Sequence, residues 1–124
     1  KPILYMTKLI FHILNLIFLI LYIYPGSILG FLFYRSFEKQ PQITSDFVVS
    51  SNHVYAFMLL SFLGFINYYK NHKNLIICYF FLISIILELL HLIIPNRSFQ
   101  FSDLFGNIIG VIFSILIFYI WRKK

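Results

Sequence analysis

Charged residues are scarce in this chain of 124 residues: they make up only 11% of it, and only four are acidic. Hydrophobic residues make up 60%, and the mean hydropathy is +0.87. A soluble domain of this size could not bury so much apolar surface, so lipid must solvate much of the chain. The composition therefore argues against a soluble protein and predicts one membrane domain over residues 1–124.

Cysteine is scarcer still. Cys78 is the single cysteine, so an internal disulfide is excluded, and we interpret it as a packed, unreactive thiol within an apolar run. The sequence also lacks a pair of cysteines, a glycine-rich phosphate loop and the Ser/His/Asp spacing of hydrolases. None of the familiar catalytic motifs therefore points to a reaction.

Basic residues outnumber acidic ones and give a net charge of +6, but they are not gathered in one place. They flank apolar runs and do not form a basic stripe interleaved with aromatic residues, so we predict no nucleic-acid partner. The 16 Phe and nine Tyr suit contact with lipid tails and with the membrane interface.

Four apolar runs are long enough to cross a bilayer as helices. They cover about residues 3–24, 54–69, 75–94 and 104–121. The runs do not alternate with the two-residue period of a membrane β-barrel, so we predict an all-α bundle of four transmembrane helices. The first run is too long for the apolar part of a signal peptide, and we interpret it as a retained anchor.

The connections between the runs differ in length. Pro25 and Gly26 interrupt the first run, and residues 27–34 continue it either as a kinked extension or as an interfacial segment; the sequence leaves both open. Residues 35–52 read as a polar loop, and residues 69–74 (YKNHKN) as a tight basic turn.

The basic residues predict an orientation. With four spans both termini share a side, and that side holds seven of the ten Lys and Arg residues, whereas Arg35, Lys39 and Arg97 lie on the other. The seven are Lys1, Lys8, Lys70, Lys73, Arg122, Lys123 and Lys124. Because basic residues favour the cytoplasmic side, we predict that both termini are cytoplasmic. All four carboxylates then fall on or near the outer side.

The scarce polar groups gather in the stretch ELLHLIIPNRSFQFSDLFGNIIG, residues 88–110. We expect Glu88 to lie about 9 Å below the outer end of a helix that reaches Ile94, with His91 on the same face. A carboxylate at that depth costs about 2–3 kcal/mol unless it has a partner. A loop that follows Pro95 can fold back and bring Arg97 to Glu88.

The last apolar run begins with Asp103, which we predict to be the helix N-cap, and Asn107 lies one turn deeper on the same face. Gly106, Gly110 and Ser114 form a strip of small residues that favours close helix packing.

This cluster has two interpretations. In the first, Glu88 and Arg97 are a structural ion pair, Asp103 is a cap and Asn107 is an interhelical contact. In the second, which we favour, Glu88, His91, Arg97, Asp103 and Asn107 form an outward polar pocket that binds a ligand, because ionisable residues within a membrane are usually functional.

Metal-binding and catalytic interpretations have less support in the sequence. Glu88 and His91 have the spacing of half a di-iron helix pair, but the other half is absent. A site that adds His53 and Asp103 remains an alternative; we predict no metal and no cofactor. His91 is predicted to be a hydrogen-bonded interhelical residue, with a general-base role as the alternative. No catalytic residue is assigned.

One family shares this pattern. The order and spacing of Glu88, Pro95, Arg97, Asp103, Asn107 and Gly110 resemble the C-terminal signature of the VanZ-like membrane proteins. The chain departs from the family where His91 replaces a Gln. It departs again in SSNHVYAF, where Asn52 and His53 align with an Asp-Lys pair and Ala56 aligns with a His.

The resemblance implies a small multi-pass protein of the bacterial inner membrane with an outward polar site. It links the chain to low-level resistance to the glycopeptide teicoplanin, and it implies no particular reaction.

Three functions are open at this point. In the first, the pocket binds an anionic lipid head group or a lipid-linked envelope precursor, with Arg97 as the bidentate contact and Glu88 orienting it. In the second, the chain is an enzyme acting on a lipid-linked substrate, with Glu88 or His91 as acid/base. In the third, it is a structural subunit whose glycine strip faces another protein or a second copy. Membrane lipids are partners in all three.

Overall fold

The computed structural model describes residues 2–46 and 48–123. This part of the chain forms four helices and no strand, which confirms the all-α prediction. They are α1 (Pro2–Ile23), α2 (Ile28–Tyr34), α3 (Ser51–Leu90) and α4 (Phe101–Lys123). Three of them, α1, α3 and α4, are long and apolar enough to cross a membrane.

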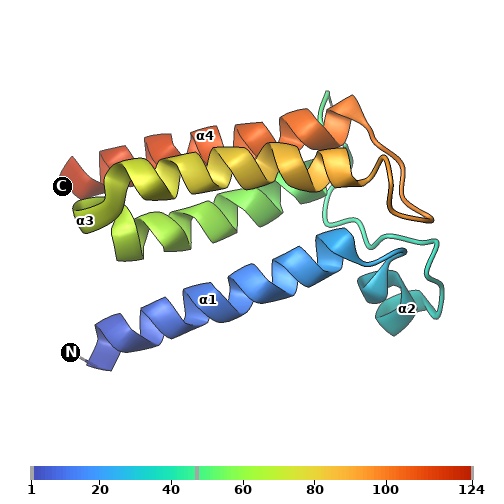
Figure 1. Cartoon of the computed structure of the whole chain (residues 1–124), viewed down its shortest axis with the longest axis horizontal. Helices are drawn as coiled ribbons and strands as arrows, with labels where there is room; N and C mark the ends of the chain where they lie inside the picture. The colour runs from blue at the N-terminus through green and yellow to red at the C-terminus, as the bar shows by residue number, and fades with distance from the viewer. Residues whose placement is uncertain (1, 47, 124) are drawn as a thin grey trace.

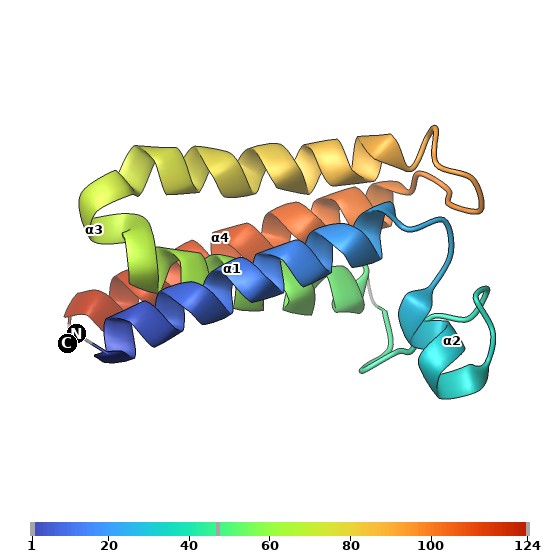
Figure 2. The same cartoon turned by 60° about the horizontal axis from the view of Figure 1, so that its bottom comes forward.

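Helix α3 is two arms rather than one rod. Its 40 residues would extend about 60 Å as a straight helix, twice the thickness of a bilayer core. His72 has the non-helical angles φ −136° and ψ 44°, and the chain turns back there (Figure 2). The first arm (residues 51–71) and the second arm (73–90) therefore run antiparallel. The turn predicted over residues 69–74 is shorter in the structure, where His72 is its single non-helical residue.

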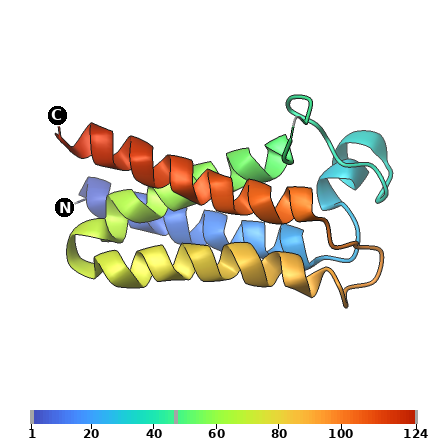
Figure 3. The same cartoon turned by 90° about the horizontal axis from the view of Figure 1, so that it is seen from above.

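The bundle has two different ends. Both described ends of the chain lie at one end, together with the turn at His72 (Figure 1). The opposite end holds helix α2 and residues 35–46, 48–50 and 91–100, and we call it the loop end (Figures 1 and 3). Lys1 and Lys124, used in the charge count above, lie outside the described residues.

Residues 27–34 form a separate short helix, not an extension of α1. Gly26 has φ +133°, a backbone angle that breaks the chain direction after α1. The Ser27 Oγ then accepts a hydrogen bond from the Gly30 N–H at 2.9 Å and caps α2. Arg35, in the left-handed region with φ 56°, ends it.

Close packing holds α4 against the first arm. A Cβ added to Gly110 would lie 2.6 Å from the Val54 carbonyl oxygen, and one added to Gly106 would lie 2.8 Å from the Ser50 carbonyl oxygen. Only glycine allows so close an approach between the two backbones. The glycine strip, with the buried Ser114, is therefore occupied within the chain.

Some details of the sequence analysis were wrong. The second arm ends at Leu90 and not at Ile94, because the His91 N–H bonds the Glu88 carbonyl in a tightened last turn. Helix α4 begins at Phe101, so Asp103 lies inside the first turn and is not the N-cap. Cys78 is exposed on the side of the bundle, not packed in its core.

Candidate functional site

Asn107 of α4 organises the polar groups at the loop end. Its side chain is fully buried, and its Nδ2 donates to the Ser84 carbonyl of the second arm at 3.0 Å. Because a carbonyl only accepts, this bond fixes the amide with Oδ1 facing the other way. Oδ1 lies 3.1 Å from the Tyr22 hydroxyl of α1, which donates to it, and 2.7 Å from Nδ1 of His53. Asn107 thus joins four helical segments.

This arrangement sets the tautomer of His53. The Asn107 Oδ1 can only accept, so the ring nitrogen 2.7 Å away must carry a proton. The Tyr22 oxygen, 3.0 Å from the same nitrogen, lies beside it as a second acceptor. In the neutral ring the Nε2 of His53 therefore keeps a free lone pair, directed towards the Asp103 Oδ1 at 3.7 Å.

Glu88 lies at the end of the second arm with no exposed surface. One oxygen, Oε1, accepts from the Gln100 N–H at 3.1 Å and lies 3.3 Å from Nδ1 of His91. The other, Oε2, is buried and has no hydrogen-bond partner within residues 2–46 and 48–123. A buried carboxylate oxygen without a partner is costly and calls for a cause.

His91 ties Glu88 to α1. Its Nε2 lies 2.8 Å from the Tyr22 carbonyl oxygen, which can only accept, so Nε2 carries a proton. The Nδ1 that faces Glu88 must share a proton with it, carried by the imidazole or by the carboxyl group. In either case the pair of side chains has no net charge, which suits its burial.

Arg97 is held by α1 and not by Glu88. Its Nε donates to the Tyr24 carbonyl at 3.0 Å and its Nη2 to the Leu21 carbonyl at 2.5 Å. These carbonyls lie at the C-terminal end of α1, the negative end of its dipole. Among the described residues no ion pair joins Arg97 to Glu88, so the expectation that Glu88 orients Arg97 was wrong.

Partial burial lowers the pKa of the Arg97 guanidinium, and the nearby Tyr22, Glu88 and Asp103 side chains oppose this change. Arginine starts from so high a pKa that Arg97 stays charged.

A cavity of about 550 Å³ opens beside these groups at the loop end. Its polar lining includes His53, Asp103 and Arg97, and Leu21 and Phe33 contribute to its apolar wall. The hydrogen bonds to α1 use two of the five N–H groups of Arg97, and no other hydrogen bond of its side chain is found among the described residues.

Asp46, also on the cavity wall, anchors the start of α3. Its Oδ1 accepts from the Ser51 N–H at 3.0 Å, and this bond, despite some opposing desolvation, lowers the pKa of its carboxyl group. The loop before α3 is therefore fixed to the first arm at the cavity.

The five residues predicted as ligand-binding are in one region but do not have equal access to the cavity. Arg97 and Asp103 line it, whereas Glu88, His91 and Asn107 are buried behind it. Their binding role stays a prediction.

The ligand site predicted from the sequence did not include Tyr22 or His53. Tyr22 is one of nine tyrosines in an apolar chain and carries no signal of its own. His53 had a signal, as the one histidine in SSNHVYAF, but it was considered only for the alternative metal site and not for the ligand site.

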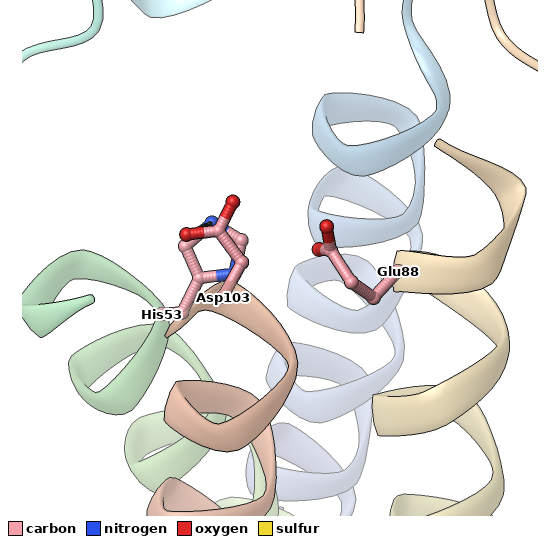
Figure 4. Close-up of side chains that lie close together, drawn as sticks. All are labelled: His53, Glu88 and Asp103. Carbon is pink, nitrogen blue, oxygen red and sulfur yellow. Dashed lines mark ion pairs between the residues drawn. The ribbon is translucent and has the colours of Figure 1, made fainter. Parts of the chain in front are cut away.

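Three side chains converge within this region (Figure 4). His53 comes from the first arm, Glu88 from the second arm and Asp103 from α4. One nitrogen or oxygen from each lies within 4.8 Å of the others. The sequence separates them widely, and only the fold of the two arms brings them together.

Comparisons with known proteins identify a family but no individual relative. A family model described as VanZ/LLP1 matches residues 3–122, nearly the whole chain. No curated protein and no solved structure matches it.

Proposed function

Because the chain belongs to the VanZ/LLP1 family, we propose that it is a multi-pass protein of the bacterial inner membrane whose cavity binds the anionic head group of an amphiphile. The head group is that of a membrane lipid or of a lipid-linked envelope precursor. The family's link to teicoplanin resistance fits an envelope ligand. The observation that carries the proposal is the Arg97 guanidinium, fixed by α1 and lining a cavity that also has an apolar wall.

In this proposal the membrane is crossed four times: by α1, by each of the two arms of α3, and by α4. The arms support it because each is about 27–32 Å long, close to the thickness of a bilayer core. Seven basic residues against three favour the cytoplasm for both termini and the outer surface for the loop end. The cavity would then open at the level of the outer head groups.

Arg97 would recognise the phosphate. Its side chain is already ordered by the Tyr24 and Leu21 carbonyls, so binding costs little further conformational entropy. A guanidinium directs its N–H groups in a fixed plane, which matches two oxygens of one phosphate. The apolar wall of the cavity, with Phe33 and Leu21, would take the first carbons of the acyl or prenyl chain.

The test is a calorimetric titration of a short-chain phosphatidic acid into the purified chain in nonionic detergent. Arg97→Lys keeps the charge and loses the planar fork, so we expect about tenfold weaker binding, roughly 1.4 kcal/mol. The matched control is Arg35→Asn, which removes a guanidinium from the same end and suits the left-handed backbone there. Equal affinity of Arg97→Lys and wild type would contradict the assigned role.

A further inference from the structure

The carboxylate oxygen Glu88 Oε2 has no described partner although it is fully buried. The carboxylate belongs to a triad with His53 and Asp103, whose ligand atoms lie within 4.8 Å of one another. We propose that this triad binds a divalent cation of the first transition series, with Zn²⁺ as its typical occupant.

His53 offers one ring nitrogen to the triad. Asn107 holds the proton on Nδ1, which leaves the Nε2 lone pair facing Asp103. The separation of 3.7 Å between Nε2 and Asp103 Oδ1 exceeds that of a hydrogen bond. Histidines that bind metals characteristically donate their other N–H to an oxygen, as His53 does to Asn107.

The triad has to contract to hold the ion. Three ligand atoms at about 2.1 Å from one tetrahedral cation lie about 3.4 Å apart. The triad atoms lie within 4.8 Å of one another, so the widest pair has to close by up to about 1.4 Å, which rotation of the side chains can supply.

The ligand set selects the kind of ion. One imidazole nitrogen and two carboxylates suit Zn²⁺ or Mn²⁺, and Mg²⁺ is disfavoured because it prefers oxygen ligands and water. With three protein ligands a tetrahedral ion keeps one open position. His53 and Asp103 line the cavity and Glu88 lies behind them, so that position faces the cavity.

Charge balance agrees with this assignment. Glu88 and His91 share one proton and are neutral together, and Arg97 offsets Asp103. A divalent cation then gives the site an excess of positive charge, which an anionic oxygen in the cavity would balance. The cation site does not depend on that ligand, and the test below contains no anionic lipid.

The test is a Zn²⁺ titration of the full chain, purified without a histidine tag, stripped with a chelator and kept in zwitterionic detergent. We expect one Zn²⁺ per chain, measured by calorimetry and by metal analysis after gel filtration. His53→Gln and Asp103→Asn should each weaken binding at least about 100-fold, since removing a direct ligand costs at least as much as removing its supporting partners. Both residues are partly exposed, so these variants should keep the thermal stability of the wild type.

The matched control is His72→Gln, which removes a histidine at the opposite end and should leave Zn²⁺ binding unchanged. Co²⁺ in place of Zn²⁺ should give a visible spectrum of nitrogen and oxygen ligands that the His53→Gln variant loses. The proposal is overturned if the wild type binds no stoichiometric Zn²⁺, or if His53→Gln and Asp103→Asn bind it as tightly as the wild type. Zn²⁺ binding without lipid binding would leave the cation site standing and refute only the head-group function.

Discussion

At the scale of single residues, hydrogen bonds from side chains to backbone carbonyls connect the loop end to α1. His91 bonds the Tyr22 carbonyl, and Arg97 bonds the Leu21 and Tyr24 carbonyls. Because the last carbonyls of a helix have no partner within it, these side chains satisfy the end of α1. The same bonds fix the two polar residues beside the cavity.

His91 should be essential to stability because its two ring nitrogens bond the Tyr22 carbonyl and the Glu88 carboxyl group. His91→Phe keeps an aromatic ring and removes both ring nitrogens, so the Glu88 Oε1 loses a partner. We expect a loss of about 3 kcal/mol in the free energy of unfolding, measured in mixed detergent micelles. His91→Gln, the matched control, retains an N–H donor and should lose less than half as much. Equal stability of the two variants would show that the Glu88–His91 pair does not stabilise the fold.

The sequence predicted part of this polar site. It placed Glu88, His91, Arg97, Asp103 and Asn107 in one region, because charged residues are conspicuous in an apolar chain. It could not predict the partners of Arg97, because these are backbone carbonyls at the end of α1, and every residue type has a backbone carbonyl. Tyr22 was invisible for a similar reason: its hydroxyl acquires its role only when α1 crosses α3 and α4.

At the scale of helices, the apolar runs predicted each long segment to within a few residues. Hydropathy specifies length and burial, so it located α1, α4 and the two arms of α3. Helix ends depend on single bonds, such as that from the His91 N–H to the Glu88 carbonyl, and were misplaced. The sequence left residues 27–34 open between a kinked extension of the first run and an interfacial segment, because their apolar residues fit both. The backbone angle of Gly26 and the Ser27 cap make them a separate helix, α2.

Gly110 should be the position most sensitive to added volume in α4. A side chain there meets the Val54 carbonyl oxygen and the Phe57 Cβ, so Gly110→Leu must push α4 away from the first arm. We expect a loss of about 2 kcal/mol in the free energy of unfolding, measured by the same method. Ile112→Leu, an exposed position on the same helix, should change it by less than 0.5 kcal/mol or so. A Gly110→Leu protein as stable as the Ile112→Leu control would contradict the close packing.

At the scale of the whole molecule, the two ends of the bundle differ in charge as well as in structure. Basic residues gather near the termini and the His72 turn, whereas the cavity and all four carboxylates lie towards the loop end. This asymmetry predicts a single orientation in the membrane.

Labelling of single cysteines tests that orientation. In a Cys78→Ala background, Glu38→Cys places a thiol at the loop end and Lys73→Cys places one beside the His72 turn; both native side chains are exposed. A membrane-impermeant maleimide added to intact spheroplasts should label Glu38→Cys and should label Lys73→Cys only after permeabilisation. The reverse pattern would place the cavity in the cytoplasm.

The most direct measurement of the central claim is native mass spectrometry of the chain extracted with its lipids. Wild type, Arg97→Ala and the Arg35→Asn control would be compared after confirming that all three are folded. We predict a specific anionic lipid or lipid-linked precursor on wild type and on Arg35→Asn, absent from Arg97→Ala. If folded Arg97→Ala retains the same anionic ligand as wild type, or if wild type retains none, the cavity at the loop end is not a head-group site.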